Sequence, residues 1–315
     1  MRASPQSPRG LSVIIVSWNA ASTIEACLDS LLAHAPDRFF EILMMDNAST
    51  DATVDLARRR GERVRITELG ENRGFAAACN EGYRRSRGEY LLFLNSDIEA
   101  LPAALENLCR FMDSHPAAAA AGGKLVGTDG MVQKGFNVRG FPTLVSTAFE
   151  ILMVDKILPG NRVTRKQRML DFSYADASEV DQPAGACFLV RRSVFETVGL
   201  FDERFYPAWF EDVDLCLRLR ENGSKVFFVP EAAFRHRGAA SLEHLAYREF
   251  LSFWYKNLLR YFEKHRGKSS TLLLRGLIVI GMSARMLAGF LVRPKPSVGR
   301  KDALAAYWRV LRETL

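Results

Sequence analysis

The amino-acid sequence predicts an α/β fold, with a mostly parallel sheet flanked by helices and a helical extension at the C-terminal end. In the first third of the 315 residues, short apolar runs alternate with segments of helical spacing, which is the pattern of successive βαβ units. Polar side chains directly follow several of these runs, as they do at the ligand-binding edge of an open sheet. From Leu242 onward, long helical patterns rich in aromatic and basic residues replace the alternation.

Four runs in the first third predict strands, and the first of them is predicted to be buried, because a parallel sheet covered on both faces is apolar along its whole strands. The runs are 11–18 (LSVIIVSW), 40–46 (FEILMMD), 63–69 (RVRITEL) and 89–95 (EYLLFLN). Between and after them, helices are predicted over 22–34, 51–60, 75–85 and 101–112. The first begins with Ser22 and Glu25 at capping-box spacing, and the second has N-cap candidates in Ser49-Thr50-Asp51.

The middle of the chain is less regular. Residues 127–180 mix Gly, Pro and charged residues, and we expect a mobile excursion there with a helix near 144–157. Beyond it the sequence predicts a strand over 186–192, a helix capped by Ser193 and Glu196, a helix from Asp212 to about Asn222, and a strand over 225–229.

Composition bounds the class of protein. With 48% hydrophobic and 25% charged residues, the chain has the make-up of a globular protein, which excludes a disordered, collagen-like or disulfide-stapled one. The five cysteines are scattered and form no C-x-x-C pair, so no zinc or redox site is predicted and a reducing compartment, the cytoplasm, fits best. Residues 1–10 carry no apolar stretch of a secretory signal, and we expect them to be disordered.

The formal net charge of +7 is concentrated in one segment. Residues 248–301 hold twelve Lys and Arg against two Glu, a net charge of +10. No nucleic-acid recognition motif accompanies this charge, so we expect no nucleic-acid partner and instead an anionic membrane surface. The apolar stretch 271–292 is long enough for a membrane span, but Arg275 and Arg285 interrupt it, which favours a helix lying in the interface. A tilted span or hairpin, or a tail packed on the rest of the chain or on a second subunit, are the open alternatives.

Two polar groups in the N-terminal half suit nucleotide binding. Asp46, at the end of the second predicted strand, can accept hydrogen bonds from a base or a ribose hydroxyl; alternatively it only caps a turn. Asn72-Arg73-Gly74 opens a helix whose first amides can face a diphosphate, and Gly74 allows close approach of the backbone. Each signal is weak by itself.

Two further groups suit a metal ion. Asn95-Ser96-Asp97 follows the fourth predicted strand, where a carboxylate with a polar residue two positions before it can hold Mg²⁺ or Mn²⁺; a capped turn is the alternative. His236 is a candidate ligand, although a single histidine is more often structural or solvated.

A cluster of acidic residues opens the predicted helix near residue 212. Glu211, Asp212 and Asp214 all lie in the segment FEDVDLCLR (210–218). A helix N-terminus favours such charges, so the cluster has an electrostatic explanation as well as a functional one.

The chain resembles the nucleotide-sugar glycosyltransferases of family 2, especially their bacterial rhamnosyltransferase-like branch. The resemblance covers roughly residues 11–240 and rests on the ordered series VIIVSWN, DNASTD, ENRGFAAACN, LFLNSD, GACFLVRR, FEDVDLCLR and RHRGAAS. It implies a GT-A fold with a Rossmann-like sheet, a nucleotide-binding half over about 11–126 and an acceptor half over about 127–240. Residues 241–315 would then form the helical, basic segment that associates with a membrane.

The resemblance also implies roles for single residues on the donor side. Asp46 would contact the nucleotide base, in a pocket that Ser17 and Asn19 also line. Asn95-Ser96-Asp97 stands in the place of the family's D-x-D motif, which makes Asp97 the principal metal ligand. Asn95 departs from that motif: an amide ligates metal more weakly than a carboxylate, and it has ribose or diphosphate binding as its alternative.

Two more positions match the family's functional residues. His236 matches the histidine that completes the metal site in related enzymes. Asp212 matches the catalytic base, with Glu211 beside it as the second candidate.

The implied reaction is an inverting transfer of one sugar. A bound Mg²⁺ or Mn²⁺ stabilises the departing nucleoside diphosphate, and Asp212 takes the proton of an acceptor hydroxyl that attacks the anomeric carbon from the opposite face. Such a single displacement needs one base, whereas a glycosidase needs two carboxylates. The Q-x-x-R-W motif and several spans of processive synthases do not occur in the sequence, so we expect one sugar per encounter.

By the same resemblance, the expected donor is dTDP-rhamnose and the expected acceptor a polyprenyl-diphosphate-linked saccharide in cell-envelope polysaccharide synthesis. The protein is then expected as a peripheral protein on the inner face of the cytoplasmic membrane, with a homo-oligomer left open. A non-catalytic membrane scaffold that retains the binding domain is the alternative. A dinucleotide-dependent oxidoreductase is excluded, because VSWNAAST stands where G-x-G-x-x-G would be required.

Overall fold

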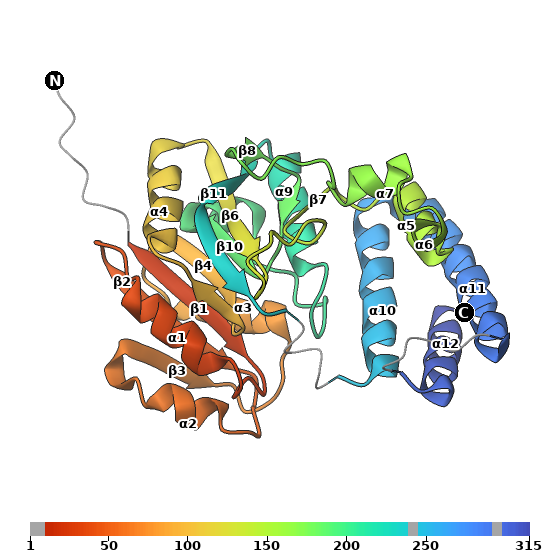
Figure 1. The fold of residues 1–315 in the computed structure, drawn as a ribbon, viewed down its shortest axis with the longest axis horizontal. Helices are drawn as coiled ribbons and strands as arrows, with labels where there is room; N and C mark the ends of the chain where they lie inside the picture. The colour runs from red at the N-terminus through yellow and green to blue at the C-terminus, as the bar shows by residue number, and fades with distance from the viewer. Residues whose placement is uncertain (1–9, 239–244, 292–297) are drawn as a thin grey trace.

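A mixed sheet with helices on both faces forms the centre of the computed structural model, which describes residues 10–238, 245–291 and 298–315 (Figure 1). Its strands are β1 (Leu11–Ser17), β2 (Phe40–Asp46), β3 (Val64–Glu68), β4 (Tyr90–Asn95), β5 (Ile98–Ala100), β6 (Ala118–Val126), β7 (Val138–Arg139), β8 (Ser178–Glu179), β9 (Gln182–Pro183), β10 (Cys187–Arg191) and β11 (Lys225–His236). Nine strands form the main sheet in the order β3-β2-β1-β4-β10-β6-β11-β5, with β8 paired to β11, and β7 pairs with β9.

The predicted α/β class is confirmed, and the parallel part of the sheet is its N-terminal half. β1 pairs in parallel with β2 and β4, and β2 with β3, so the carboxyl ends of these strands share one edge. β10 then runs antiparallel to both β4 and β6. The sheet is therefore mixed where the second half of the chain joins it.

Helices cover the sheet and continue beyond it. They are α1 (Ile24–Ala33), α2 (Thr53–Arg58), the 3₁₀ turn η1 (Gly61–Arg63), α3 (Phe75–Arg85), α4 (Ala104–Ser114), α5 (Leu144–Ile151), α6 (Val154–Ile157), α7 (Arg162–Gln167), α8 (Arg192–Val198), α9 (Glu211–Glu221), α10 (Tyr247–His265), α11 (Gly267–Leu291) and α12 (Arg300–Thr314). Successive strand residues point to opposite faces, so Val13 and Ile15 pack in the core under α1 and α4, whereas Ile14 packs in the core under α3 and α9.

Both predicted capping boxes are wrong. α1 takes Thr23 rather than Ser22 as its N-cap residue, and the Thr23 hydroxyl donates to the Ala20 carbonyl at 3.3 Å instead of capping the helix. α8 begins one residue before Ser193, because β10 passes directly into the helix with Arg191 as the N-cap. The helix predicted near 144–157 is divided into α5 and α6 at a left-handed residue between them.

β6 follows an alanine-rich segment, AAAAGGKLV, that does not have the composition of a strand. Two glycines explain why the residues of this strand are small. A Cβ on Gly122 would lie 2.3 Å from Cβ of Pro183, and a Cβ on Gly123 would lie 2.5 Å from the Ala232 carbonyl oxygen. Small residues are therefore required because β9 and β11 approach β6 so closely.

β11 is longer than the predicted strand over 225–229. Pro230 ends the apolar run, yet the strand resumes its pairing with β6 at Ala233 after a register shift and continues to His236. Bulges are where proline is tolerated inside a sheet. This extension carries His236 alongside β5, where it pairs opposite Ile98.

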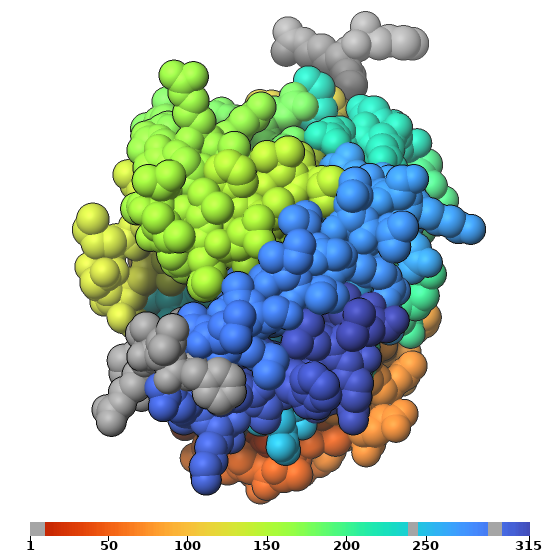
Figure 2. All heavy atoms as spheres, turned by 90° about the vertical axis from the view of Figure 1, so that its right-hand side faces the viewer, coloured from red at the N-terminus to blue at the C-terminus, as the bar shows by residue number. Residues whose placement is uncertain are grey.

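The predicted C-terminal helices are confirmed, and α10, α11 and α12 pack on one another through buried side chains such as Tyr261, Ile278 and Val310. α11 also lies close against α5, since a Cβ on Gly281 would be 2.5 Å from Cγ2 of Ile151. Figure 2 shows α5–α7 in yellow-green beside these blue helices on one face of the molecule. In the described part of the chain, one stretch, Gly267–Ala288, has the length and composition of a membrane span. The predictions for residues 1–9 and 239–244 lie outside the described residues.

Candidate active site

Asp46 ends β2 and is buried beside the end of β1. Its Oδ1 accepts hydrogen bonds from the hydroxyls of Ser17 at 2.9 Å and Ser49 at 2.5 Å, and its Oδ2 accepts one from the Ser49 amide at 2.8 Å. These bonds hold the turn after the strand, which is the turn-capping role. Contact with a nucleotide base stays a prediction for Asp46, and so does the pocket role of Ser17.

Asn19 ties the loop after β1 to the same turn. Its backbone adopts a left-handed φ of 49°, its Oδ1 accepts from the Thr50 amide at 2.8 Å, and its own amide donates to the Ser49 hydroxyl at 2.9 Å. Asparagine tolerates this conformation better than most residues, which explains its place here. The observed role of Asn19 is to fix the loop geometry.

Asn47 connects this turn to the Asn72-Arg73-Gly74 segment and is not among the predicted site residues. Its Oδ1 accepts from the Arg73 amide at 3.2 Å, and its Nδ2 donates to the Gly74 carbonyl at 3.3 Å. Asn72 Oδ1 in turn accepts from the Gly74 amide at 3.0 Å. Both Asn47 and Asn72 line the central cavity. The position of Asn47 directly after Asp46 is the feature of the sequence that could have identified it.

Gly74 allows the backbone to lie close to the loop before α9, and its close approach to a diphosphate stays a prediction. Its φ is +83°, and a Cβ there would lie 2.9 Å from both the Pro207 carbonyl oxygen and Cδ2 of Tyr206. The first amide of α3, that of Phe75, donates to the same Pro207 carbonyl at 2.6 Å. The start of α3 is therefore joined to the loop that precedes α9.

Asp97 and His236 form a buried pair at the carboxyl edge of the sheet. His236 Nε2 lies 3.6 Å from Asp97 Oδ2, and both residues are about 95% buried, with exposures of 5% and 6%. The antiparallel pairing of β5 with the end of β11 brings them together, and the Arg237 amide donates to the Asp97 carbonyl at 3.2 Å.

Gln133 fixes the orientation of the His236 ring. Gln133 Nε2 donates to the His236 carbonyl at 3.0 Å, which turns Gln133 Oε1 toward Nδ1 of the ring at 2.8 Å. Nδ1 then carries the proton and leaves the Nε2 lone pair facing Asp97. Phe136 stacks on the ring with centroids 5.1 Å apart. Burial lowers the pKa of His236 below its ordinary value and outweighs the opposite effect of the Asp97 charge, so the neutral ring is favoured.

The pair fits a divalent cation. A carboxylate oxygen and an imidazole lone pair that face each other repel unless a cation or proton lies between them. In the described residues no third His, Cys, Asp or Glu joins them. A hard cation here would therefore complete its shell with substrate phosphates and water, as Mg²⁺ usually does. Asn95 also lines the cavity, whereas Ser96 is buried and does not.

Asp212 lies on the first turn of α9 with both carboxylate oxygens held by the backbone. Its Oδ2 accepts from the Gly185 amide at 2.9 Å and its Oδ1 from the Val213 amide at 2.8 Å. A Cβ on Gly185 would lie 2.6 Å from Oδ2, so only glycine fits at this position. Burial raises the pKa of Asp212, although the two amides and the charge of Arg139 oppose the rise. A carboxylate with a raised pKa is a stronger base.

Glu211 is more deeply buried than Asp212. It is 5% exposed, and its Oε2 has no hydrogen-bond partner among the described residues. Burial, together with the charges of Asp212 and Asp214, raises its pKa well above the ordinary value. The backbone amides fix both oxygens of Asp212, whereas Glu211 Oε2 has no such partner among the described residues, so Asp212 is the better oriented of the two carboxylates.

The loop before these acids is held from the C-terminal extension. Trp209 and Phe210 both have a left-handed φ, 76° and 75°, which is costly for aromatic residues. Asn257 of α10 is fully buried, and its Nδ2 donates to the carbonyls of Tyr206, Ala208 and Trp209 at 3.1, 2.8 and 3.3 Å. α10 therefore fixes the backbone that directs Glu211 and Asp212.

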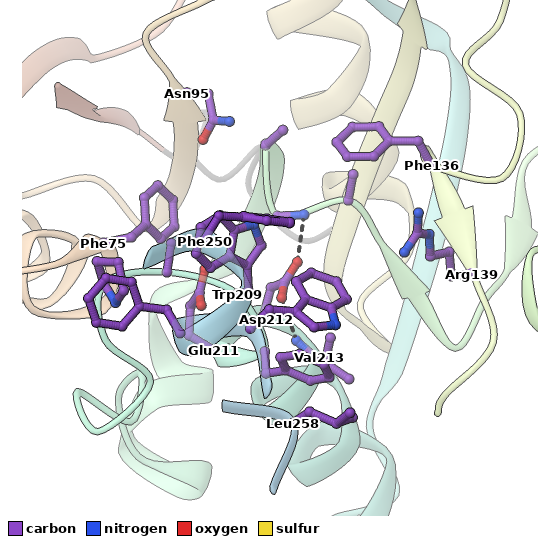
Figure 3. Close-up of a pocket in the computed structure, with 18 of the residues that line it drawn as sticks. Phe75, Asn95, Phe136, Arg139, Trp209, Glu211, Asp212, Val213, Phe250 and Leu258 are labelled. Carbon is purple, nitrogen blue, oxygen red and sulfur yellow. Dashed lines mark hydrogen bonds between the residues drawn. The ribbon is translucent and has the colours of Figure 1, made fainter. Parts of the chain in front are cut away.

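One cavity of about 1050 Å³ joins these groups (Figure 3). Of the predicted site residues, Asn72, Asn95, Asp97, Glu211, Asp212 and His236 line it, and Ser17, Asn19, Asp46, Arg73, Gly74 and Ser96 do not. Aromatic side chains close the cavity from the loop before α9 and from α10, with Trp209 and Phe250 packed edge to face at 5.1 Å. Figure 3 shows Phe75 and Asn95 on one side of Asp212, and Phe136 and Arg139 on the other.

Comparison with known proteins identifies the family. The family model described as glycosyl transferase family 2 matches residues 12–199. An N-acetylglucosaminyl-diphospho-decaprenol L-rhamnosyltransferase from Mycobacterium tuberculosis (strain ATCC 25618 / H37Rv) is 31% identical over 242 residues, which cover 73% of this chain and 77% of the relative. The rhamnosyltransferase WbbL from Escherichia coli (strain K12) is 28% identical over 270 residues, which cover 79% of this chain and 92% of the relative.

A solved structure shares the fold. The solved mannosyltransferase PcManGT from Pyrobaculum calidifontis, in complex with GDP-Man and Mn²⁺, matches 98% of this chain and 89% of its own with a TM-score of 0.56 and 17% identity. This likeness confirms the GT-A-type sheet flanked by helices. With the family model matching more than half of its residues and a relative 31% identical over 73% of its length, the chain is an enzyme that belongs to glycosyltransferase family 2.

Proposed function

We propose that this glycosyltransferase transfers rhamnose from dTDP-rhamnose, with inversion, to a hydroxyl of a polyprenyl-diphosphate-linked saccharide in cell-envelope polysaccharide synthesis. The observation that carries the proposal is a single cavity lined both by the Asp97–His236 pair and by Asp212. The pair suits the diphosphate of a donor, and a backbone-held carboxylate suits the activation of an acceptor.

The residues divide the work between two ends of the cavity. Asp97 and His236 would hold Mg²⁺ or Mn²⁺, which supplies positive charge to a leaving diphosphate when bound. Asp212 would accept the proton of the acceptor hydroxyl, and the Gly185 and Val213 amides keep its oxygens in place. Asn47, Asn72 and Asn95 line the donor end and offer amide groups to a nucleoside diphosphate.

The relatives support the substrate classes. The mycobacterial relative is named for a rhamnosyl transfer to an N-acetylglucosaminyl-diphospho-decaprenol, and the E. coli relative for rhamnosyl transfer. The screen that tests the proposal is a panel of nucleotide sugars measured by thermal shift with Mn²⁺, followed by turnover against lipid-diphosphate saccharides. Preference for another donor would contradict the rhamnose assignment, and a β-configured product from a β-donor would contradict inversion.

The same assay separates the enzyme from a binding scaffold. An active transferase should hydrolyse its donor slowly in the absence of acceptor and in the presence of Mg²⁺ or Mn²⁺. Binding without hydrolysis or transfer would favour the non-catalytic alternative.

We further propose that the protein acts at the inner face of the cytoplasmic membrane, held by α11. Four large apolar side chains of α11 are at least 60% exposed: Leu272, Leu273, Ile280 and Leu287. Lys and Arg dominate the charge of this segment, which suits anionic headgroups. Flotation with liposomes should show binding that rises with anionic lipid and falls with salt. Failure to bind at any salt concentration would favour a tail packed only on protein.

A further inference from the structure

We propose that Arg139 binds the diphosphate of the lipid-linked acceptor, so that the saccharide hydroxyl lies beside Asp212. The proposal rests on the function proposed above and adds a residue of the acceptor site. Arg139 is the last residue of β7, and it lines the central cavity on the side away from Phe75 and Asn95 (Figure 3).

Among the described residues, no carboxylate forms a salt bridge with the guanidinium of Arg139. Its Nε donates to the Gly135 carbonyl at 2.6 Å. Burial and the charge of Arg168 lower the pKa of Arg139, and the charges of Glu150 and Asp212 oppose them. A cation in such surroundings is costly unless a ligand supplies the opposite charge. Arginine is also the side chain best suited to a diphosphate, since it can bind two phosphate oxygens at once.

The position of Arg139 favours the acceptor over the donor. β7 pairs with β9, with Arg139 opposite Gln182, and the chain then reaches Gly185, whose amide holds Asp212. Figure 3 shows Arg139 and Asn95 on opposite sides of Asp212. Arg139 thus belongs to the end of the cavity where the base works.

Helix α5 connects the part of the cavity near Arg139 with α11, the helix proposed to contact the membrane. Thr147, Glu150 and Ile151 of α5 line the cavity, and Ile151 at the same time contacts α11 at Gly281. On the outside of α5, Val145 is 57% exposed. A lipid that leaves the cavity along α5 would therefore reach the apolar face of α11 with its diphosphate still at Arg139.

The experiment compares Arg139→Gln with the wild type on two acceptors. One is the lipid-diphosphate saccharide, and the other is the same saccharide as a simple alkyl glycoside without phosphate. Loss of a charged hydrogen bond predicts that KM for the diphosphate acceptor rises about 10- to 100-fold in the variant. KM for the nucleotide sugar and kcat/KM for the alkyl glycoside should stay within about twofold. Arg139→Lys should recover part of the loss, because it keeps the charge but not the bidentate geometry.

A matched control is Arg110→Gln, which removes an exposed arginine of α4 that pairs with Glu106. It should leave both acceptors unaffected. Equal loss on the two acceptors would overturn the proposal, since Arg139 would then act only through Asp212. A rise in KM for the nucleotide sugar alone would assign Arg139 to the donor diphosphate and would equally overturn it. If the wild type transfers sugar to neither acceptor, the proposed function itself fails, and the role of Arg139 falls with it.

Discussion

His236 Nε2 lies 3.6 Å from Asp97 Oδ2, although the two residues are far apart in the chain. The contact exists because β11 continues past Pro230 and pairs with the short strand β5 directly after Asp97. Gln133 holds the other nitrogen of the ring, so the pair is oriented before any ligand arrives. Such preorientation by outer-shell groups is typical of metal sites.

The Asp97–His236 pair yields the first prediction. Asp97→Ala and His236→Ala should each weaken the Mn²⁺-dependent part of nucleoside-diphosphate binding. Gln133→Leu should weaken Mn²⁺ affinity about 10- to 100-fold, because the ring loses the partner that fixes its tautomer. Calorimetry with and without Mn²⁺ measures both effects, and metal-free binding serves as the control. Unchanged Mn²⁺ affinity in Asp97→Ala would contradict the assignment.

The second prediction concerns the base. Asp212→Asn should lower kcat at least about 100-fold, since the amide cannot accept the acceptor proton. Nucleotide binding, measured by calorimetry, should remain nearly intact because Asp212 does not belong to the metal pair. Near-normal turnover of this variant would remove Asp212 from the role, and Glu211→Gln tested in parallel would show whether Glu211 takes it.

Gly185 provides a steric test of the same carboxylate. A methyl group at this position would lie 2.6 Å from Asp212 Oδ2, so Gly185→Ala should displace the carboxylate and lower kcat. Gly160→Ala is the matched control, because nothing lies within 4 Å of a Cβ built there. Steady-state kinetics should separate the two variants, and equal activity would show that Asp212 tolerates displacement.

Asn257 should matter for catalysis without touching substrate. Asn257→Leu leaves three carbonyls of residues 206–209 without their donor, so the loop before α9 should relax and kcat should fall more than donor KM rises. Asn107→Leu is the control, since Asn107 donates one hydrogen bond, to the Glu231 carbonyl, away from the cavity. A variant that loses thermal stability but keeps kcat would show that Asn257 is only structural.

Asp214 gives a prediction for stability and its pH dependence. It is fully buried and accepts hydrogen bonds from Arg218 at 2.9 Å and from Lys264 and His265 at 2.7 Å. Burial alone would raise its pKa, but the His265 hydrogen bond and the charges of Arg218 and Lys264 outweigh it and lower the pKa below 3.8. Asp214→Asn should therefore cost about 3–5 kcal/mol of unfolding free energy at neutral pH, because it uncouples a buried charge network.

The sign of the pH dependence follows from the lowered pKa. A carboxylate whose pKa falls on folding contributes its full stabilisation above the unfolded value of 3.8 and loses it as the pH drops through the folded value. The difference between wild type and Asp214→Asn in urea unfolding should stay constant from neutral pH down to about pH 5. A difference that already shrinks in this range would contradict the lowered pKa.

The sequence predicts those helices and strands whose residues carry a clear local pattern. The helix predicted over 75–85 is found as α3 with the same bounds, and the strands β1–β4 follow the apolar runs within two residues. β6 is not predicted, because its small residues fit the close approach of β9 and β11. These strands are distant in the sequence, so a local pattern does not reveal them.

The residues of the candidate site also fall into a predicted group and a group that was not predicted. Asp97, His236 and Asp212 carry their chemistry in the residue type and its place in a motif, and they do share one cavity. Gln133 and Asn257 have unremarkable sequence contexts and acquire their roles only through long-range contacts, and Arg139 is brought to the cavity by the pairing of β7 with β9. The full length of β11 is also not predicted from the sequence. Pro230 suggests the end of a strand, yet the strand continues and brings His236 close to Asp97.

The involvement of α10 in the cavity has a practical consequence. The family match ends at residue 199, yet Phe250, Trp254 and Asn257 of α10 enclose or brace the reaction chamber. Ending the chain before α10 to obtain a smaller enzyme would open that chamber to solvent and release the loop that positions Asp212, and ending it at residue 199 would also remove Asp212 and His236 themselves. Replacing α10 with that of a relative, by contrast, would change one wall of the cavity while leaving the Asp97–His236 pair in place.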